Sequence, residues 1–439
     1  MQTIYRWRLI VLTSRTYVSD PKRRLLVVKA AMTVNGGAAR DLLRNLEEIN
    51  NIFEVKFACL NILPEQEKII ENLGIEILVP EKQWISKGGL WNELSAGQER
   101  SASKSWLDHA PIHEAMKWAD AIHLTGGNGS MEFPKFVNPN TPMHLHYLEA
   151  KPGIHDNISH YNPNGGGRWR AFVMHLLQIY QRRRIEKSFS LFNNNNKWIV
   201  SANSAFSAEN LHNIYRIKGD VLYPSVDLAE FSRKETIGEV SELEKISGLK
   251  GKNYVVTVGR ISWFKGIYEA VDHLAGNNLD LVLIGGGTSE ENSNLKKYAE
   301  KHDIRLTILS GISSEAMRAV IRQAKAVIGL AHGEAFGLTP IEAMAIGTPP
   351  IFVNEGGYRE TVVNNKNGML LKRGDYASWK LAFELIDDPS VREKWANEGL
   401  LQIEKMGLTP ENHAKRLSKI VNQLILEAKM SDVGIEGGE

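Results

Sequence analysis

Residues 333–347 read Gly-Glu-Ala-Phe-Gly-Leu-Thr-Pro-Ile-Glu-Ala-Met-Ala-Ile-Gly and begin one residue after an apolar run at residues 326–331. The apolar run is typical of a buried parallel strand. Within the quoted stretch, Thr339 is predicted to cap a helix, Glu342 to complete its capping box, and Gly347 to end it. The pattern therefore predicts a strand, a glycine-containing loop, and a helix whose first N–H groups face the loop. Such helix starts attract anions, because those N–H groups lack partners inside the helix.

Two carboxylates, Glu334 and Glu342, flank this predicted anion site with seven residues between them. From the spacing alone, the favoured interpretation is that Glu342 caps its helix and Glu334 is a solvated loop residue. The residues around them, however, resemble the signature of the family 4 (group 1) retaining glycosyltransferases. The resemblance rests on Phe336-Gly337-Leu338, Ala343-Met344-Ala345, Gly356-Gly357, Glu360 and Asn367-Gly368. It implies the GT-B fold, in which two Rossmann-like domains face each other across a cleft.

The composition is that of an ordinary soluble globular protein, with 43% hydrophobic and 24% charged residues. A chain of 439 residues is too long for one core, so two domains are expected. The formal net charge of +2 gives no reason to expect nucleic acid as a partner. The single cysteine, Cys59, cannot form an intrachain disulfide and fits a reducing compartment. No apolar segment is long enough to span a bilayer, and residues 5–12 carry too much charge for a secretory signal, so a cytoplasmic location is expected.

Strand-like and helical segments alternate twice along the chain, which is typical of parallel sheets covered by helices. The second alternation begins after a polar segment at 225–252, which predicts a linker. The predicted fold is α/β, with two Rossmann-like doubly wound domains. The resemblance implies that a C-terminal helix returns to the N-terminal domain. The predicted divisions are an N-terminal extension (1–24), an N-terminal acceptor-side domain (25–228), a C-terminal nucleotide-sugar-binding domain (229–408), the returning helix (409–430) and a tail (431–439).

Two cations, Arg260 and Lys265, follow the strand predicted at 254–259. They are expected at the carboxyl edge of the second sheet, where ligands bind in such folds. Considered alone, an Arg and a Lys in a loop are usually solvated charges. Together with the stretch at 333–347, they resemble the pair that holds the donor diphosphate in this family. Fixed cations and helix-start amides would stabilise the charge that a departing nucleoside diphosphate gains, so neither a metal nor another cofactor is expected.

The first domain contains a second strand–glycine–helix corner at Gly37. A tight turn explains it equally well, but the resemblance implies a loop that approaches the donor phosphates. His144 and His146 share one face of the strand at 142–147, a pattern that suits a metal site. Nothing else supplies a ligand set at a recognisable spacing, so a metal is disfavoured. The resemblance implies that His146 faces the donor sugar, with His144 as the competing assignment.

The resemblance also assigns roles within the donor site. Residues 310–312 are either a plain strand-to-helix turn or the loop whose backbone brackets the nucleobase. Glu342 would hold the ribose hydroxyls, and Glu334 would meet the hydroxyls of the sugar. The implied catalytic residues are His146, Glu334, Arg260 and Lys265. The implied donor-binding residues are Gly37, Arg260, Lys265, Gly311, Ile312, Glu334, Ala335, Phe336, Gly337, Leu338, Thr339 and Glu342.

The function that the resemblance implies is retaining transfer of a hexose from a nucleotide-diphosphate sugar. The donor would be a GDP- or UDP-hexose of mannose or glucose type, and the acceptor a hydroxyl on a glycan, a lipid-linked sugar or a small molecule. The acceptor would attack from the face that the leaving group departs, and its proton would pass to a phosphate oxygen. The alternatives are another nucleotide-sugar enzyme of the same fold, such as an epimerase, and a noncatalytic subunit that binds a nucleotide sugar or a glycan.

Residues 168–187 combine basic and apolar side chains and contain one acid, Glu186. An amphipathic basic helix on an anionic membrane would have this pattern. A helix that packs against its own domain and keeps a solvated basic face would have it as well. Related enzymes often use lipid-linked acceptors, so peripheral contact with the inner face of a membrane stays open beside the packing helix.

Overall fold

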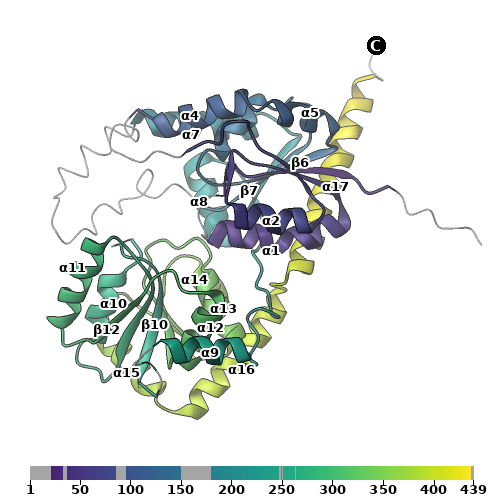
Figure 1. The fold of residues 1–439 in the computed structure, drawn as a ribbon. Helices are drawn as coiled ribbons and strands as arrows, with labels where there is room; N and C mark the ends of the chain where they lie inside the picture. The colour runs from purple at the N-terminus through teal and green to yellow at the C-terminus, as the bar shows by residue number, and fades with distance from the viewer. Residues whose placement is uncertain are drawn as a thin grey trace, which may run out of the picture.

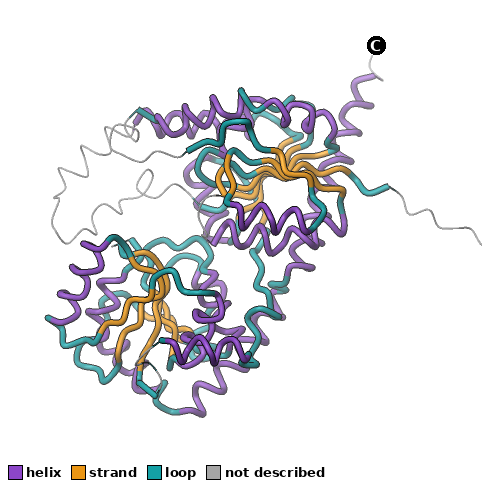
Figure 2. Tube along the Cα trace, in the orientation of Figure 1, coloured by secondary structure: helices purple, strands orange, loops and turns teal. Residues whose placement is uncertain are grey.

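The computed structural model describes residues 21–32, 37–85, 95–149, 179–246, 249, 251–262 and 264–436. The chain forms two lobes, each built on a parallel sheet with helices on both faces (Figures 1 and 2). The predicted α/β fold with two doubly wound domains is therefore confirmed. Most of the extension predicted at 1–24 lies outside the described residues. The part that is described leads into the first strand, where Arg24 binds Asp120.

The N-terminal lobe has a seven-stranded parallel sheet in the order β5-β3-β1-β6-β7-β8-β9. Its strands are β1 (Arg24–Val28), β3 (Glu54–Ala58), β5 (Glu76–Leu78), β6 (Ala121–Thr125), β7 (Met143–Tyr147), β8 (Trp198–Ala202) and β9 (Asp220–Val221). Its helices are α1 (Gly37–Ile52), α2 (Pro64–Asn72), α4 (Gly97–Leu107), α5 (Ala110–Trp118), the 3-10 helix η1 (Ser130–Phe136), α7 (Ile179–Asn193) and α8 (Ala205–Tyr215). A small separate pair is formed by β2 (Ala31–Met32) and β4 (Asn61–Ile62).

The central strand β1 shows why this lobe needs helices on both faces. Leu25 and Val27 belong to one buried cluster, and Leu26 and Val28 belong to the cluster on the opposite face. Successive side chains of a strand point to opposite faces, so an unbroken apolar run requires cover on both sides.

The C-terminal lobe has a six-stranded parallel sheet in the order β12-β11-β10-β13-β14-β15. Its strands are β10 (Tyr254–Arg260), β11 (Asp280–Gly286), β12 (Leu306–Leu309), β13 (Ala326–Gly329), β14 (Pro350–Val353) and β15 (Met369–Leu371). Its helices are α9 (Ile237–Lys245), α10 (Ile267–Leu274), α11 (Ser289–Glu300), α12 (Ser314–Gln323), α13 (Leu338–Ile346), α14 (Tyr358–Thr361), α15 (Tyr376–Leu385) and α16 (Pro389–Met406).

A long final helix, α17 (Pro410–Glu436), runs from the C-terminal lobe along the N-terminal lobe (Figure 1). Its apolar residues Leu417 and Val421 are buried in the same cluster as Leu25. The predicted return of a C-terminal helix to the first domain is confirmed, and the helix extends past the predicted end at residue 430.

The polar segment at 225–252 is more than a linker, because it contains helix α9, which packs on α12. The carboxylate of Glu239 is buried there and accepts hydrogen bonds from Arg318 at 3.0 Å and Arg322 at 2.9 Å. The prediction failed because the charges suggested solvent exposure, whereas they form a buried ion-pair network.

Within the part of the chain that the structure describes, none of the helices combines the length and apolarity that a bilayer crossing requires.

Candidate active site

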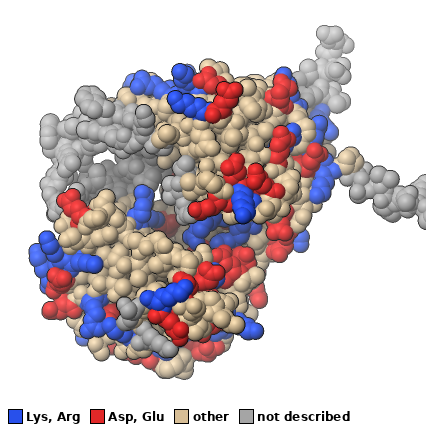
Figure 3. Space-filling view, viewed as in Figure 1, with Lys and Arg blue, Asp and Glu red and all other residues tan. Residues whose placement is uncertain are grey.

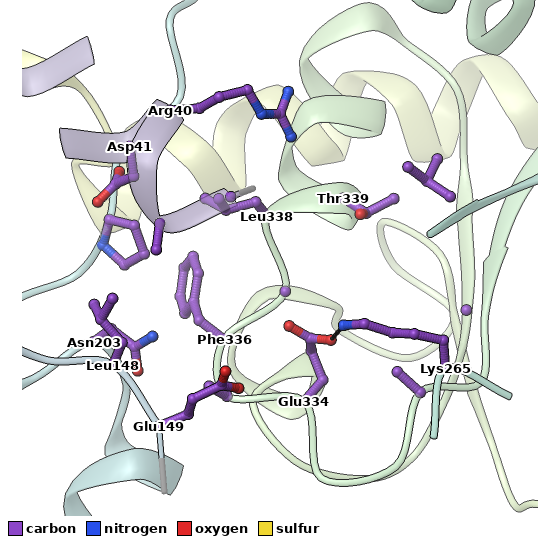
Figure 4. Close-up of a pocket in the computed structure, with 18 of the residues that line it drawn as sticks. Arg40, Asp41, Leu148, Glu149, Asn203, Lys265, Glu334, Phe336, Leu338 and Thr339 are labelled. Carbon is purple, nitrogen blue, oxygen red and sulfur yellow. Dashed lines mark hydrogen bonds and ion pairs between the residues drawn. The ribbon is translucent and has the colours of Figure 1, made fainter. Parts of the chain in front are cut away.

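A cavity of about 670 Å³ lies between the two lobes, where the surface is hollowed (Figures 3 and 4). From the N-terminal lobe it is lined by Lys29, Ala31, Gly37, Ala38, Ala39, Arg40, Asp41, Asn128, Leu148, Glu149, Asn203 and Pro224. From the C-terminal lobe it is lined by Thr257, Val258, Lys265, Gly329, Leu330, Ala331, Glu334, Ala335, Phe336, Gly337, Leu338, Thr339, Phe352 and Tyr358. Parallel strands of both sheets end here, as expected for a ligand site in doubly wound domains.

Helix α13 begins at the cavity, but not in the way that its sequence predicts. The helix starts at Leu338, and the residue before it is Gly337 with a φ of 86° and no side-chain cap. A Cβ on Gly337 would meet the ring of Tyr358 at 2.6 Å, so a larger residue would not fit at this position. The predicted capping box of Thr339 and Glu342 is therefore wrong, whereas Gly347 ends the helix as predicted. Without a side-chain cap, the N-terminal N–H groups of α13 are open to a ligand.

Lys265 and Glu334 meet at the C-terminal wall of the cavity, where the Lys265 Nζ atom lies 2.7 Å from Glu334 Oε2 (Figure 4). Burial alone would lower the pKa of Lys265, but the carboxylate of Glu334 outweighs it and the pKa is raised. The lysine is therefore a permanent cation here. Without a ligand the two groups satisfy each other. A bound diphosphate would pair with the Lys265 cation, and a sugar hydroxyl would donate a hydrogen bond to the Glu334 carboxylate, so that the ion pair would separate.

Glu342 does not line the cavity; its buried carboxylate lies in the joint between the lobes. Its Oε1 atom is 3.3 Å from Arg44 Nη2 and 3.7 Å from Arg40 Nη1, and both arginines are on α1 of the other lobe. The two arginines explain why Glu342 does not cap its own helix. An ion pair with two cations satisfies the carboxylate better than a single backbone N–H group would.

Two further contacts span the joint beside the cavity. The carboxylate of Glu360 on α14 accepts hydrogen bonds from the backbone N–H groups of Ala205 and Phe206, both at 2.9 Å. It therefore caps the start of α8 from the opposite lobe. The hydroxyl of Ser204 donates to the carbonyl oxygen of Ala335. These contacts hold the 333–337 loop against the N-terminal lobe.

Gly37 lies at the start of α1, and a Cβ there would come within 3.1 Å of the Leu338 side chain. The helix start of the first lobe therefore faces the helix start of α13 across the cavity. This is the arrangement that the resemblance implies for the glycine loop and the donor phosphates.

Besides Glu342, four predicted residues lie outside this cavity. The ring of His146 is buried, its Nε2 atom is 3.0 Å from the Leu222 carbonyl oxygen, and it packs against His413 of α17. The prediction that His146 faces the donor sugar is therefore corrected, because α17 covers that face of β7. His144 is also buried, with its Nδ1 atom 2.9 Å from that of His123.

The other three predicted residues outside the cavity are Arg260, Gly311 and Ile312. Arg260 is exposed at the carboxyl end of β10, and its charge acts on Lys265. Gly311 has a φ of 65° and lies with Ile312 in the loop after β12, which Ser310 joins to Gly285. All three are at the correct edge of the sheet without lining this cavity. Among the described residues, no cluster of His, Cys, Asp and Glu has the geometry of a metal site.

Cavity residues from both lobes were missed from the sequence, and the charged and amide side chains among them all belong to the N-terminal lobe. Asn203 has a buried side-chain oxygen that lacks a hydrogen-bond partner among the residues that the structure describes. Arg40 and Asp41 follow the glycine corner that the sequence did indicate, and Figure 4 places both at the cavity. Glu149 lies two residues past the end of β7. Position at a strand end was the only available signal for Glu149 and Asn203, and it does not distinguish a ligand contact from a turn.

Lys29 is the most unusual of these residues, because it is a buried lysine one residue past the end of β1. Its ammonium group donates to the Gly126 carbonyl oxygen at 3.1 Å. Burial lowers its pKa from 10.5 to about 8, although nearby Asp41 opposes the change. The first lobe therefore presents a lysine to the cavity that is easily deprotonated.

The lowered pKa of Lys29 predicts how stability depends on pH. Between about pH 8 and 10.5 the unfolded chain binds this proton and the folded protein does not, so the free energy of unfolding rises with pH. The difference corresponds to roughly 3 kcal/mol. Lys29→Met should remove this rise, as measured by urea unfolding of both proteins from pH 7 to 10. If the free energies of unfolding of the two proteins change with pH in parallel, the charge of Lys29 does not destabilise the folded protein.

The described part of the basic segment at 168–187 lies in α7, where Gln181 and Arg184 bind the rest of the lobe while Arg183 and Lys187 are exposed. Arg184 binds the buried carboxylate of Glu132 with contacts of 3.0 and 2.6 Å, and Gln181 donates to Glu99. For these residues the structure agrees with a helix that packs against its own domain. Residues 168–178 lie outside the described part of the chain.

Comparisons with known proteins agree with this geometry. Residues 240–401 match the family model described as "Glycosyl transferases group 1". The D-inositol 3-phosphate glycosyltransferase of Pseudarthrobacter chlorophenolicus is 27% identical over 224 residues, which cover 47% of this chain and 52% of that protein. The chain thus spans about half the length of this curated relative.

Two solved structures share the two-lobed arrangement. HepE of Anabaena, in complex with UDP and glucose, is 16% identical with a TM-score of 0.66, covering 91% of this chain and 100% of that chain. Sucrose-phosphate synthase of Thermosynechococcus elongatus is 16% identical with a TM-score of 0.69, covering 92% and 100%. At these identities the likeness establishes a shared fold alone.

Proposed function

We propose that this chain, whose C-terminal domain is a group 1 glycosyltransferase and whose fold is GT-B, transfers a hexose with retention of anomeric configuration. The donor is a nucleotide-diphosphate sugar, and the acceptor is a hydroxyl on a glycan, a lipid-linked sugar or a small molecule. The observation that carries the proposal is the Lys265–Glu334 pair beside the uncapped start of α13, on one wall of the interdomain cavity.

Each group on this wall has a proposed role. Lys265 binds the diphosphate, with help from the N–H groups at the start of α13 and from Arg260 at the same edge of the sheet. Glu334 accepts hydrogen bonds from hydroxyls of the sugar once Lys265 has turned to the phosphate. Gly37 lets the first lobe approach closely from the opposite side. These fixed charges and dipoles favour the charge that builds up on the leaving group, without requiring a metal.

The transfer step uses the donor itself as the base. The bond between the anomeric carbon and the diphosphate oxygen breaks, and a bond to the acceptor oxygen forms on the same face of the sugar. The acceptor proton passes to a phosphate oxygen of the departing nucleoside diphosphate. The product keeps the configuration of the donor, and the enzyme is returned unchanged.

Three parts of the proposal, the donor, the cellular location and the membrane contact, are supported by fewer observations. UDP-glucose is the first donor to test, because HepE was crystallised with UDP and glucose. GDP-mannose is the second. We also keep the proposals that the protein is cytoplasmic and that residues 168–187 contact an anionic membrane, although the described part of that segment packs on Glu132 and Glu99.

Nucleotide binding gives the direct test. UDP or GDP at millimolar concentration is expected to raise the midpoint of thermal unfolding by a few degrees, because a ligand at 100 times its Kd stabilises by about 2.7 kcal/mol. UMP and GMP are matched controls that lack the second phosphate, and they should give smaller shifts. Radiolabelled UDP-glucose and GDP-mannose then test for turnover.

The outcomes separate the alternatives. Slow hydrolysis of one donor supports the transferase. An isomerised sugar nucleotide formed without any acceptor favours an epimerase. Binding without hydrolysis or transfer favours a noncatalytic subunit. Absence of any shift with both nucleoside diphosphates would remove the nucleotide site itself.

A further inference from the structure

A second, smaller cavity of about 140 Å³ lies within the N-terminal lobe and adjoins the interdomain cavity. We call it the side pocket. Its walls come from the loop after β6, the end of β7, and one face of α7, including Ile185, Ser188 and Phe189. Asn128, Leu148 and Glu149 line both cavities, so the side pocket borders the main cavity along these three residues. Figure 4 shows Leu148 and Glu149 at the edge of the main cavity, facing the loop that contains Glu334.

The size of the side pocket limits its ligand to a single ring. A cavity of about 150 Å³ accommodates benzene. The side pocket therefore has room for one six-membered ring and not for a nucleotide.

One polar group in the side pocket has no partner. Tyr147 is 3% exposed, and its hydroxyl lacks a hydrogen-bond partner within the described ranges of the chain. Its ring is held edge-on by Phe189 at 5.8 Å and Tyr215 at 6.4 Å, and those two rings stack at 3.8 Å. Burial raises the pKa of Tyr147, so its hydroxyl keeps its proton and can donate it. A buried hydroxyl without a partner is costly, which a ligand oxygen would relieve.

The charges of the side pocket favour a neutral ligand. Its described lining includes three carboxylates, Glu99, Glu132 and Glu149, and no Lys or Arg. Arg184 and Lys135 pair with Glu132, and the ammonium group of Lys29 donates to the lining residue Gly126. Carboxylates accept hydrogen bonds from hydroxyl groups. With Glu132 already paired, Glu99 and Glu149 are the carboxylates that would repel a phosphate or a carboxylate placed beside them.

We propose that the side pocket binds a neutral, polyhydroxylated six-membered ring, a sugar or a cyclitol, that forms the end of the acceptor. Tyr147 donates a hydrogen bond to one of its oxygens, and another hydroxyl points past Asn128 and Glu149 toward the donor sugar. This inference rests on the proposed transferase function and adds the chemical class of the acceptor.

The test blocks the side pocket and measures binding directly. The probes are methyl α-D-glucopyranoside, methyl α-D-mannopyranoside and myo-inositol, with glucose 6-phosphate as the anionic counterpart, observed by saturation-transfer NMR in the presence of UDP. Ile185→Trp fills the pocket and should weaken the signals of the neutral rings at least tenfold. The matched control is Glu186→Trp at the next, exposed position of α7, which should behave like the wild type.

Tyr147→Phe separates a ligand role from a purely structural one. Removing an unpartnered buried hydroxyl should leave the midpoint of thermal unfolding unchanged or raise it. The same variant should bind the neutral rings several-fold more weakly. A structural role alone would lower the unfolding midpoint and leave ring binding intact.

Three results would overturn the proposal: neutral rings that bind Ile185→Trp as well as the wild type, glucose 6-phosphate that binds better than the glucoside, or no binding of any ring to a protein that binds UDP. Donor hydrolysis and nucleotide binding are measured on the same variants and should not change. If the wild type fails to bind nucleotide, the transferase function fails, and the side pocket is then judged on ring binding without UDP.

Discussion

Lys265→Ala is expected to lower the rate of hexose transfer by roughly a hundredfold or more, because it removes the cation nearest to the proposed diphosphate position. Losing one preorganised donor that stabilises charge in a transition state typically costs about 2.7–4 kcal/mol. The variant also leaves the Glu334 carboxylate without its partner at 2.7 Å, which should weaken donor binding. Initial rates with UDP-glucose and GDP-mannose, with and without a sugar acceptor, measure the effect.

Two comparisons make this result specific. Lys297→Ala removes an exposed lysine from α11 and should leave the rate unchanged. Arg260→Ala removes the second cation at the same sheet edge and should also slow transfer, although its side chain is outside the cavity lining. A Lys265→Ala protein that is folded and works at nearly the wild-type rate would rule out the diphosphate assignment.

Replacing Glu342 by Leu is expected to lower the free energy of unfolding by about 3–5 kcal/mol, the usual cost of breaking a buried ion pair from one side. The substitution removes the carboxylate nearest to Arg40 and to the almost fully buried Arg44, and leaves Glu230 as the remaining acid that acts on Arg44. Arg44→Met should cost less, because Arg40 remains near the carboxylate at 3.7 Å. Urea unfolding measures the three proteins under identical conditions.

The double variant Arg44→Met, Glu342→Leu is the control for this prediction. Replacing a whole buried ion pair by apolar side chains is often nearly neutral, so the double variant should recover much of the loss. If Glu342 serves only to hold a ribose, Glu342→Leu will change stability by no more than a surface substitution does. That result would contradict the ion pair as a support of the joint.

The sequence predicted the fold well because the decisive signals are local. The apolar run of β1 is buried on both faces, as its composition indicates. The strand, glycine loop and helix around residues 326–347 occur where the pattern places them. Gly347 ends α13 because a φ of 99° suits glycine.

The errors arise where distant segments compete with local preferences. Thr339 and Glu342 have the spacing of a capping box, but two arginines about 300 positions earlier in the chain bind Glu342 instead. His146 does share a strand face with His144, as the alternation predicts. That face is covered by α17, whose His413 packs on His146 from a segment far along the chain. No local pattern reports either partner.

The side pocket and the buried Lys29 could not be found from the sequence for the same reason. The side pocket combines residues from α4, β7, α7 and the end of α8, which no short motif relates. Lys29 follows an apolar strand and resembles an ordinary boundary residue. Only the folded structure shows that Lys29 is buried and that the Gly126 carbonyl oxygen accepts a hydrogen bond from its ammonium group.

The hydrogen bonds of Glu360 to Ala205 and Phe206 have a consequence for turnover. If the two lobes move apart, these hydrogen bonds break together with those of Ser204 and Glu342. The contacts between the lobes therefore act as one set that is made or broken at the same time. If the proposed donor enters and leaves by such an opening, these contacts break in every catalytic cycle. Opening and transfer would then be consecutive events, and the start of α8 would lose its Glu360 cap at each opening.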